Sequence, residues 1–500
     1  MKHLSVLTGN RPSPADRSAA GREARLRPRA EPVARIIELA IAMLGVFAVR
    51  WTGGSWELVA IMTAVLGITA FIIRRRCPKS RGHDRWVLAR SVIAVPVVWT
   101  LVSFVSYVGH DNGDTFVQRV TTWGRDHHLG GAIDFMETRM YSAPPSKTPA
   151  KKLELAIALV PPSAQPSTAS SPAAASTTPP AQESSAATVS VPSTVAPIVA
   201  ATTDTAVAVG PTTVTPVAPT PLNPVFSPIL DGEGQWSPIA RAAGQDTMWA
   251  TSIRPLPSAG GVVASMVVID QTNLRAGLFN GAEEPGGSWE RGNRVPPELQ
   301  PALLAAMNGG FRFEHIKGGY KTEGTTVKPL KDGDATLAVA KDGRLALGQL
   351  GRDLLDDGSW ISLRQNLILI VDDGQSQVQR GVDEGVWWGA DYGNEVYVPR
   401  SAVCELADSR LAYVLVGKVN ASQLAQSLIN LGCVKAMQLD INGTWPVFFT
   451  FAPGGDGALT GTFLDRRMGG NPSRYITGST KEFFAFFDST LVPAGSVLDK

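Results

Sequence analysis

The chain is poor in the residues that bind transition metals, with three cysteines and six histidines among 500 residues. His110, His127 and His128 are close in sequence, but no second group of ligands follows at a suitable spacing. We therefore expect solvated histidines and no metal or other cofactor, with calcium held by oxygen ligands left open. The net charge of +2 gives no indication of a nucleic-acid partner.

Residues 36–108 contain few charged side chains outside one short loop. Apolar runs at residues 36–49, 58–73 and 86–108, with flanking tryptophans, predict three transmembrane helices. The loop at residues 74–85 has six basic residues and one acid, Asp84, and residues 1–35 form an arginine-rich tail with too little apolar content for a core. Because positive loops stay in the cytoplasm, we expect a disordered cytoplasmic tail, a multi-pass protein of the cell membrane and an extracellular C-terminal domain.

Residues 143–235 consist largely of proline, alanine, serine, threonine and valine, and between Leu155 and Leu230 only Glu183 and Asp204 are charged. Frequent prolines exclude regular helix and sheet, so this segment is predicted to be a disordered, extended linker. Its composition is also typical of O-glycosylated stalks. The preceding residues 109–142 are polar and amphipathic, which predicts a juxtamembrane helical segment. The linker would let a domain at residues 236–495 reach away from the membrane.

Residues 236–495 are enough for one sizeable core. Their pattern of strands and turns with a few helices predicts an α+β domain with a mixed sheet. The clearest helix is expected at residues 422–431, with Ser422 as its N-cap and Gly432 as its end. It leads into an apolar strand that ends at Asp440, immediately before a polar turn. Strands are expected at residues 262–269, 303–308, 336–340, 345–347, 367–371, 411–416 and 434–439.

The three cysteines agree with this topology. Cys77 falls in the loop expected to be cytoplasmic, where a thiol stays reduced. Cys404 and Cys433 both fall on the side expected to be extracellular, where a disulfide is permitted. We therefore predict a disulfide between Cys404 and Cys433 that closes a loop containing the helix at residues 422–431.

Polar residues stand at the ends of several predicted strands, where folds usually place site residues. Paired glycines let the backbone approach a ligand closely, and long basic side chains form charge-assisted hydrogen bonds with phosphate. Taken singly, each segment also has a structural explanation as a turn, a turn cap or a surface ion pair. The residues concerned are Asn308, Gly309, Gly310, Lys321, Glu323, Arg364, Asn366, Arg400 and Asp440.

The order of these motifs over residues 236–490 resembles the phosphodiester glycosidase family, which includes the enzyme that uncovers mannose 6-phosphate. Asn308–Phe311 corresponds to the family's Asn-Gly-Gly-Phe, and Arg400 corresponds to its arginine before a small apolar strand. Leu439–Thr444 corresponds to its Leu-Asp-Gly-Gly-Gly-Ser turn. The membrane-anchored layout with Trp123–Gly131 looks like that of actinobacterial members.

One part of the resemblance is incomplete. Asp440 matches the family's turn, but Ile441 and Asn442 stand where the family has glycines, and Thr444 replaces serine. Because a glycine-rich turn would hold the substrate closely, these bulkier residues favour a competing function. That alternative is a non-catalytic module that binds an envelope glycan or a phosphate-containing polymer. A purely structural, stalked surface protein would explain the linker but not the polar strand ends.

The resemblance implies an enzyme that hydrolyses the glycosidic bond of a sugar–phosphate diester in an envelope glycan or glycolipid. An oxocarbenium-like transition state needs a nearby carboxylate, for which Asp440 is the first candidate and Glu323 the second. Arg400 would stabilise the charge of the departing phosphate. The partners expected are this substrate and the lipid bilayer. The residues expected to bind substrate are Asn308, Gly309, Gly310, Lys321, Arg364, Asn366, Asn442 and Thr444.

Overall fold

The computed structural model describes residues 100–109, 116–156, 216–389, 396–441, 445–455 and 457–499. Within these residues, no helix combines the length and the apolar character needed to cross a membrane. The predicted basic tail, the first two apolar runs and most of the third lie outside the described residues. The fold described is mostly β-sheet and contains no helix that could cross a membrane, so the prediction of three transmembrane helices before an α+β domain is wrong for it.

The strands form three sheets in which every described pairing is antiparallel. The eight-stranded sheet has the order β1 (Ser237–Ala242), β2 (Gln245–Ile253), β3 (Ala264–Ile269), β14 (Leu411–Val419), β13 (Val398–Leu406), β15 (Cys433–Ile441), β11 (Val371–Asp372) and β12 (Gln375–Ser376). One five-stranded sheet has the order β7 (Thr325–Lys328), β6 (Tyr320–Thr322), β10 (Trp360–Gln365), β8 (Ala335–Ala340) and β9 (Leu345–Gln349). The other has the order β17 (Leu459–Phe463), β16 (Phe448–Pro453), β5 (Leu303–Asn308), β18 (Phe483–Asp488) and β4 (Leu274–Phe279).

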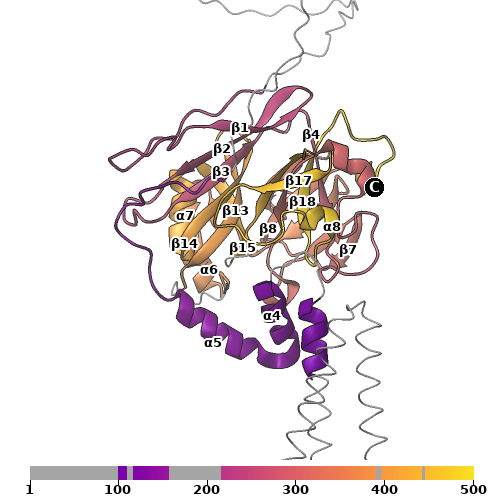
Figure 1. The fold of residues 1–500 in the computed structure, drawn as a ribbon, viewed down its shortest axis with the longest axis horizontal. Coiled ribbons are helices and arrows are strands. Elements are labelled where there is room, and N and C mark those ends of the chain that lie inside the picture. Colours follow the sequence, from indigo (N-terminus) through magenta and orange to yellow (C-terminus); the bar gives the residue numbers. More distant parts are fainter. Residues whose placement is uncertain are drawn as a thin grey trace, which may run out of the picture.

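Helices are few and short in the domain, which is why the α+β prediction fails. In Figure 1, α7 and α6 lie beside the eight-stranded sheet, and α4 and α5 lie below the strands. The α-helices are α4 (Phe116–Gly124), α5 (Gly130–Tyr141), α6 (Val378–Asp383), α7 (Ala421–Asn430) and α8 (Arg474–Thr477). The π-helix η1 (Arg125–Leu129) joins α4 to α5, and the 3-10 helices are η2 (Pro297–Ala302), η3 (Phe313–His315) and η4 (Val497–Asp499).

Helix α7 begins one residue earlier than predicted, and its N-cap lies two residues earlier. Asn420, rather than Ser422, is its N-cap: the Asn420 side chain accepts a hydrogen bond from the backbone N–H of Gln423 at 2.9 Å. The Gln423 side chain accepts the N–H of Asn420 at 3.4 Å, so the two residues form a capping box. Leu424 and Leu428 on α7 are fully buried against one face of the eight-stranded sheet. The helix thus covers the sheet that carries Asp440.

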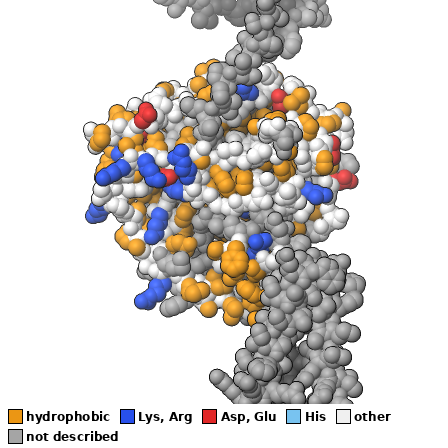
Figure 2. All heavy atoms as spheres, in the orientation of Figure 1, with side chains coloured by type: hydrophobic (Ala, Val, Ile, Leu, Met, Phe, Trp, Pro, Cys, Tyr) orange, Lys and Arg blue, Asp and Glu red, His pale blue; other side chains and the backbone are white. Residues whose placement is uncertain are grey.

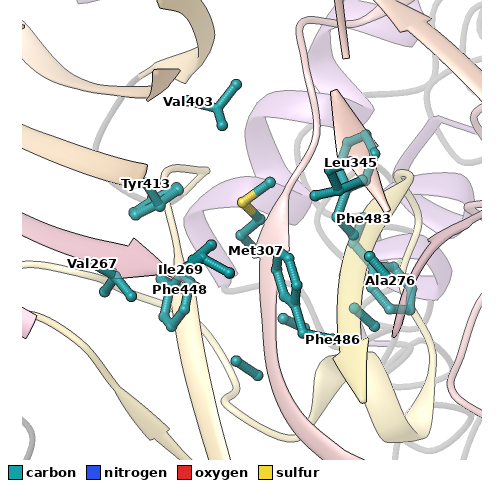
Figure 3. Packing of buried hydrophobic residues seen from close by; sticks show 14 of the residues in the cluster. Val267, Ile269, Ala276, Met307, Leu345, Val403, Tyr413, Phe448, Phe483 and Phe486 are labelled. Atoms are coloured by element: carbon teal, nitrogen blue, oxygen red, sulfur yellow. The ribbon is translucent and has the colours of Figure 1, made fainter. Parts of the chain in front are cut away.

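The main hydrophobic core lies where the three sheets meet (Figure 3). Val403 and Tyr413 reach it from the eight-stranded sheet, and Met307 and Phe483 reach it from the sheet that contains β5 and β18. The Phe483 ring also stacks on Tyr475 with centroids 4.1 Å apart. Full burial of a side chain of this size stabilises the fold by about 1.5–3 kcal/mol. This packing fixes the ends of β5 and β15 next to each other.

The described ends of the predicted linker pack against the domain. At one end, Gly261 donates its backbone N–H to Ser146 at 2.9 Å, and Arg466 donates its own to Glu154 at 2.8 Å. At the other end, the Trp236 indole donates to the carbonyl of Thr220 at 2.9 Å. The central part of the predicted disordered linker, residues 157–215, lies outside the described residues. Residues 142–156 therefore belong to the surface of the domain, along which they run in Figure 1.

The predicted disulfide between Cys404 in β13 and Cys433 in β15 is formed, with a sequence separation of 29 residues. A cross-link over such a loop lowers the entropy of the unfolded chain and stabilises the fold by about 3.5 kcal/mol. The double substitution Cys404→Ala/Cys433→Ala should therefore reduce the free energy of unfolding by about this amount in a denaturant titration. Cys77→Ala serves as the control and should leave it unchanged. Equal stability of the oxidised and reduced protein would contradict the prediction.

Candidate active site

Asp440 lies at the end of β15, where the apolar strand reaches the polar turn, and is only 7% exposed. Its carboxylate forms an ion pair with the ammonium of Lys481, which precedes β18. The carboxylate also accepts the backbone N–H of Ile441 at 3.0 Å. The backbone N–H of Asp440 donates to the carbonyl of Gly309 at 3.3 Å. Asp440 thus stands between the Asn-Gly-Gly-Phe turn and a lysine that the sequence analysis did not identify.

Lys481 connects three segments that are far apart in the sequence. Besides its contact with Asp440, its ammonium donates a hydrogen bond to the carbonyl of Gly310 at 2.9 Å. The same ammonium lies over the ring of Trp445 at 4.9 Å from the centroid, within the range of a cation–π interaction. An ammonium has three N–H donors. Two of them have protein acceptors among the described residues, so a third is available for a substrate.

The glycines of the Asn-Gly-Gly-Phe turn are needed because side chains of the protein lie against them. A Cβ on Gly309 would lie 2.4 Å from a carboxylate oxygen of Glu482, and a Cβ on Gly310 would lie 3.0 Å from Asn366 and 3.1 Å from Arg364. The backbone N–H of Gly310 donates to Glu482 at 3.0 Å. The two glycines were expected to let a ligand approach the backbone closely. In the structure, side chains of the protein itself occupy that space.

Arg364 and Glu482 form a buried ion pair behind this turn. Nε of Arg364 donates to Oε1 of Glu482 at 2.6 Å, and both side chains are completely buried. The guanidinium also donates to the carbonyls of Gln365, at 2.6 Å, and of Phe311, at 2.5 Å. Arg364 was expected to bind a substrate phosphate, but its donors hold the turn in place. It positions the backbone that carries the Gly310 carbonyl.

Asn308 and Asn366 likewise bind other groups of the protein. The Asn308 side-chain oxygen accepts the N–H of Val447 at 3.0 Å and the hydroxyl of Tyr413 at 3.1 Å, while its amide donates to Ser401 at 3.2 Å. Asn366 accepts the N–H of Phe311 at 3.1 Å and donates to the carbonyl of Gln438 at 2.6 Å. These two amides join the ends of β5, β10, β13 and β15.

Arg400 is completely buried near the start of β13. Its guanidinium donates to the carbonyl of Trp388 at 2.6 Å and to that of Val419 at 3.0 Å. It also donates to the side-chain oxygen of Gln438 at 3.3 Å. Arg400 was expected to stabilise the departing phosphate. The contacts described instead hold together the segment at Trp388, the end of β14 at Val419 and β15 at Gln438.

Lys321 and Glu323 lie in the hairpin of β6 and β7 and contact other parts of the domain. Lys321 forms an ion pair with Asp356 at 2.5 Å. Glu323 has a φ of 50° in the turn and accepts the backbone N–H of Arg291 at 2.7 Å. The structure thus does not bring either side chain into contact with Asp440. The remaining predicted site residues, Asn442 and Thr444, lie outside the described residues.

Glu284 is a second acid near Lys481 that the sequence analysis did not consider. Burial raises the pKa of its carboxyl group, the charge of Lys481 lowers that pKa, and the charge of Glu482 raises it further. The net direction is upward. Both carboxyl oxygens of Glu284 lie 3.3 Å from the backbone N–H of Phe313, next to the Asn-Gly-Gly-Phe turn. Asp440 and Glu284 therefore provide two carboxyl groups in different electrostatic environments around one lysine.

Three of these unpredicted residues had a sequence signal. Lys481 and Glu482 immediately precede the apolar run Phe483–Phe487, the same strand-entrance position that drew attention to Arg400. Glu284 precedes a Pro-Gly turn signal. No local pattern, however, indicates that Lys481 contacts Asp440 or that Glu482 contacts Arg364, because these contacts join segments that are distant in the sequence.

The N-terminal helical residues reach the rim of this site. Arg312, next to the Asn-Gly-Gly-Phe turn, donates to Glu283 at 2.8 Å and lies 3.8 Å from Asp126 in η1. The hydroxyl of Tyr107 donates to Glu283 at 2.8 Å. The backbone N–H of Tyr397, before β13, donates to the carbonyl of Tyr141 at the end of α5. The predicted juxtamembrane segment thus contacts the domain beside the site.

Comparison with known proteins gives a family for this region. The sequence profile described as "Phosphodiester glycosidase" matches residues 302–440. The match begins before Asn308, includes Arg364 and Arg400, and ends at Asp440. A comparison with curated protein sequences gave no significant match.

Two solved structures show a limited likeness. The catalytic domain of zebrafish N-acetylglucosamine-1-phosphodiester alpha-N-acetylglucosaminidase, auto-inhibited by its pro-peptide, is 17% identical, with a TM-score of 0.34 over 50% of this chain and 87% of that chain. A Synechocystis protein is 11% identical, with a TM-score of 0.35 over 50% of this chain and 64% of that chain. The family match confirms the resemblance inferred from the motifs: residues 302–440 match the phosphodiester glycosidase family, and this match supports a glycosidase-type hydrolase that acts on phosphodiesters.

Proposed function

We propose that this enzyme cleaves the bond between the anomeric carbon of a sugar and a phosphate oxygen, with Asp440 as the carboxylate that acts at the anomeric carbon. The observation that supports this most strongly is the Asp440–Lys481 pair beside the carbonyl of Gly310. An oxocarbenium-like transition state is stabilised by a carboxylate close to the carbon, as nucleophile or as base for water. Asp440 is held in one position by its contacts with Lys481 and Ile441, which suits either form of this chemistry.

The proposed task of Lys481 is to bind the phosphate that departs. When the glycosidic bond breaks, the bonding electron pair goes to the phosphate oxygen, so negative charge grows on the phosphate monoester. An ammonium within hydrogen-bond reach stabilises that charge in a site with little water. Among the described residues the third N–H donor of Lys481 has no acceptor, which leaves it for this contact. Trp445, against the same ammonium, provides an apolar ring face for the sugar.

Glu284 is proposed to supply the proton for the leaving phosphate oxygen. A carboxyl group whose pKa is raised by burial carries its proton at a higher pH than an ordinary glutamic acid, which is the property of a general acid. If Asp440 is the nucleophile, water then displaces it from the anomeric carbon and gives its proton to the Glu284 carboxylate. If Asp440 is the base, it takes the proton of the attacking water, and both carboxyl groups return to their starting forms by proton exchange with solvent. The two carboxyl groups thus have different roles: Glu284 is the acid, and Asp440 is the nucleophile or the base.

The pH dependence of the rate tests Glu284. Because its protonated form is the active one, kcat should fall as pH rises through the raised pKa of Glu284. Glu284→Gln cannot donate a proton and should lower kcat by about 100-fold while removing this alkaline decline. Glu298→Gln, an exposed acid on η2, is the matched control and should keep both kcat and the pH profile. An unchanged profile in Glu284→Gln would assign the proton to another group.

We further propose that the enzyme works outside the cytoplasm, on a phosphodiester of the cell envelope. The Cys404–Cys433 disulfide supports an oxidising compartment. Membrane attachment through the N-terminal part of the chain is a proposal that rests on its apolar sequence. The carboxylate of Asp440 and the ammonium of Lys481 suit a sugar linked through phosphate.

The test of the proposed function uses the full-length protein and a panel of sugar-1-phosphodiesters with different sugars and alcohols. Release of free sugar, followed over time, is the expected result for at least one diester. Saturable binding of envelope fragments without any release of sugar would overturn the proposal. That outcome would favour the non-catalytic binding module suggested by Ile441 and Asn442.

A further inference from the structure

A groove of about 590 Å³ lies on the domain surface, apart from the Asp440 site. Its walls come from separate parts of the chain: the packed segment at residues 144–154, the loop before β3, the end of β14, and Arg467. Backbone hydrogen bonds fix one wall to the other, since Ala150 donates to Gly260 at 2.8 Å and Gly261 donates to Ser146 at 2.9 Å. The groove is therefore part of the folded domain rather than a gap beside a loose linker.

The groove is strongly basic. Lys151, Lys152 and Lys418 line it with exposed side chains, and Arg467 is partly exposed. Its one acidic lining residue, Glu154, lies 3.6 Å from Lys152. Within the described ranges, neither Lys151 nor Lys418 has an acidic side chain at ion-pair distance. Figure 2 shows lysine and arginine side chains gathered on the left part of the face in view.

Arg467 is held differently from the lysines. Its guanidinium is bound to the buried carboxylate of Asp465 at 2.6 Å and to the carbonyl of Val263 at 2.8 Å. A Cβ on Gly417 would lie 2.4 Å from this guanidinium, so the glycine makes room for it. Arg467 thus forms a fixed floor, while Lys151 and Lys418 provide uncompensated charge above it.

The groove and Asp440 lie at the same end of the strands of the eight-stranded sheet. Ile441, next to Asp440, pairs with Arg400 on β13; Arg400 pairs with Val416 on β14; and Val416 pairs with Ala264 on β3. Of the groove residues, Val263 precedes Ala264, and Lys418 follows Val416 by two residues. Since neighbouring strands are about 4.8 Å apart, the groove begins about 10–14 Å from Asp440.

We propose that this groove binds a second phosphate group of the substrate, so that the enzyme acts on polymers with repeated sugar–phosphate links. The inference rests on the proposed function, because it makes the groove an additional subsite for the same substrate. A single sugar 1-phosphate bound at Asp440 is too short to reach the groove, whereas an extended chain can occupy both. Exposed lysines act as point charges without a demand for one geometry, which suits repeated phosphates.

The test compares a short sugar-1-phosphodiester with an oligomer that contains several phosphodiester links, using the full-length protein. In Lys151→Ala/Lys418→Ala, the ratio of the oligomer KM to the short-diester KM should rise about tenfold, which corresponds to about 1.4 kcal/mol. Lys331→Ala/Lys341→Ala removes two exposed lysines that precede and follow β8, in a different sheet from the groove, and should leave the ratio unchanged. An equal ratio in the parent and in both variants would overturn the proposal.

A binding measurement separates this proposal from the proposed function. Inorganic polyphosphate should bind the parent, and the slope of log affinity against log salt should decrease by about 1.4 in Lys151→Ala/Lys418→Ala, as expected for two lost phosphate contacts. If the parent releases no sugar from any diester, the proposed function fails, and unchanged polyphosphate binding in the variant refutes the groove independently. Loss of binding only to vesicles that contain phosphatidylglycerol would assign the groove to a lipid surface and overturn its assignment as a subsite.

Discussion

Asp440→Asn is expected to lower kcat for hydrolysis of a sugar-1-phosphodiester by about a thousandfold or more. The asparagine has the shape of aspartate, and its oxygen can still accept a hydrogen bond from Lys481. It cannot attack the anomeric carbon or take a proton from water, so it removes the step that a carboxylate performs. Release of free sugar under saturating substrate measures the effect, and KM should change much less than kcat because binding groups remain.

A loss of activity through misfolding must be separated from a loss of chemistry, because Lys481 would be left beside a neutral partner. Thermal melting of Asp440→Asn reports whether the domain is folded. Asp488→Asn is the matched control: Asp488 has the same 7% exposure at the end of β18, and its carboxylate accepts the N–H of Ala243 at 2.9 Å, away from the site. It should keep the parent kcat. A folded Asp440→Asn with kcat within tenfold of the parent would place the catalytic carboxylate elsewhere.

The position of Asp440 at the end of a strand was predictable because one short stretch of sequence determines it. An apolar run of strand length gives way to turn-forming residues, and the carboxylate stands at the change. The predicted strand over residues 434–439 corresponds to β15, Cys433–Ile441. The disulfide followed from a different argument, since both cysteines were expected on the extracellular side, where a disulfide is permitted. By contrast, the predicted strand at residues 367–371 forms a strand only at Val371.

The tasks of the polar residues were not predictable in the same way. Arg364 and Arg400 have the side chain that binds phosphate, yet their guanidinium groups are completely buried and donate to protein carbonyls. Burial decides whether such an arginine binds a phosphate or the protein's own carbonyls, and burial depends on the packing of all three sheets. The partner of Asp440 is 41 residues away along the chain, and Arg364 is 118 residues from Glu482. A single sequence contains no pattern for such separations.

The fold class shows a related limit. Most strand positions followed from apolar runs, but their antiparallel order brings β3 next to β14 and β5 between β16 and β18. These neighbours are distant in the sequence and are selected by the core in which Met307 and Phe483 meet. The site is thus built from local motifs that the sequence indicates and from long-range pairs that only the packed sheets provide.

Arg364→Met is expected to destabilise the domain by about 3–5 kcal/mol, because it leaves the carboxylate of Glu482 buried without its cation. Within the described residues, Oε2 of Glu482 already lacks a hydrogen-bond partner, so Oε1 carries the interactions of this group. With Arg364 gone, the backbone N–H of Gly310 is the remaining donor to Oε1 among the contacts described. Equilibrium unfolding in denaturant, monitored by tryptophan fluorescence, measures the loss.

Two comparisons show whether burial of the unpaired charge is the cause. Arg352→Met breaks ion pairs of similar length, with Asp353 and Asp372 at 2.7 Å, but Arg352 is 44% exposed, so the loss should be below about 1 kcal/mol. Arg364→Met/Glu482→Leu removes both buried charges and should be less destabilised than Arg364→Met alone, although Gly310 loses an acceptor. If the double variant is the less stable of the two, the pair itself stabilises the fold, and the cost does not come from an isolated carboxylate.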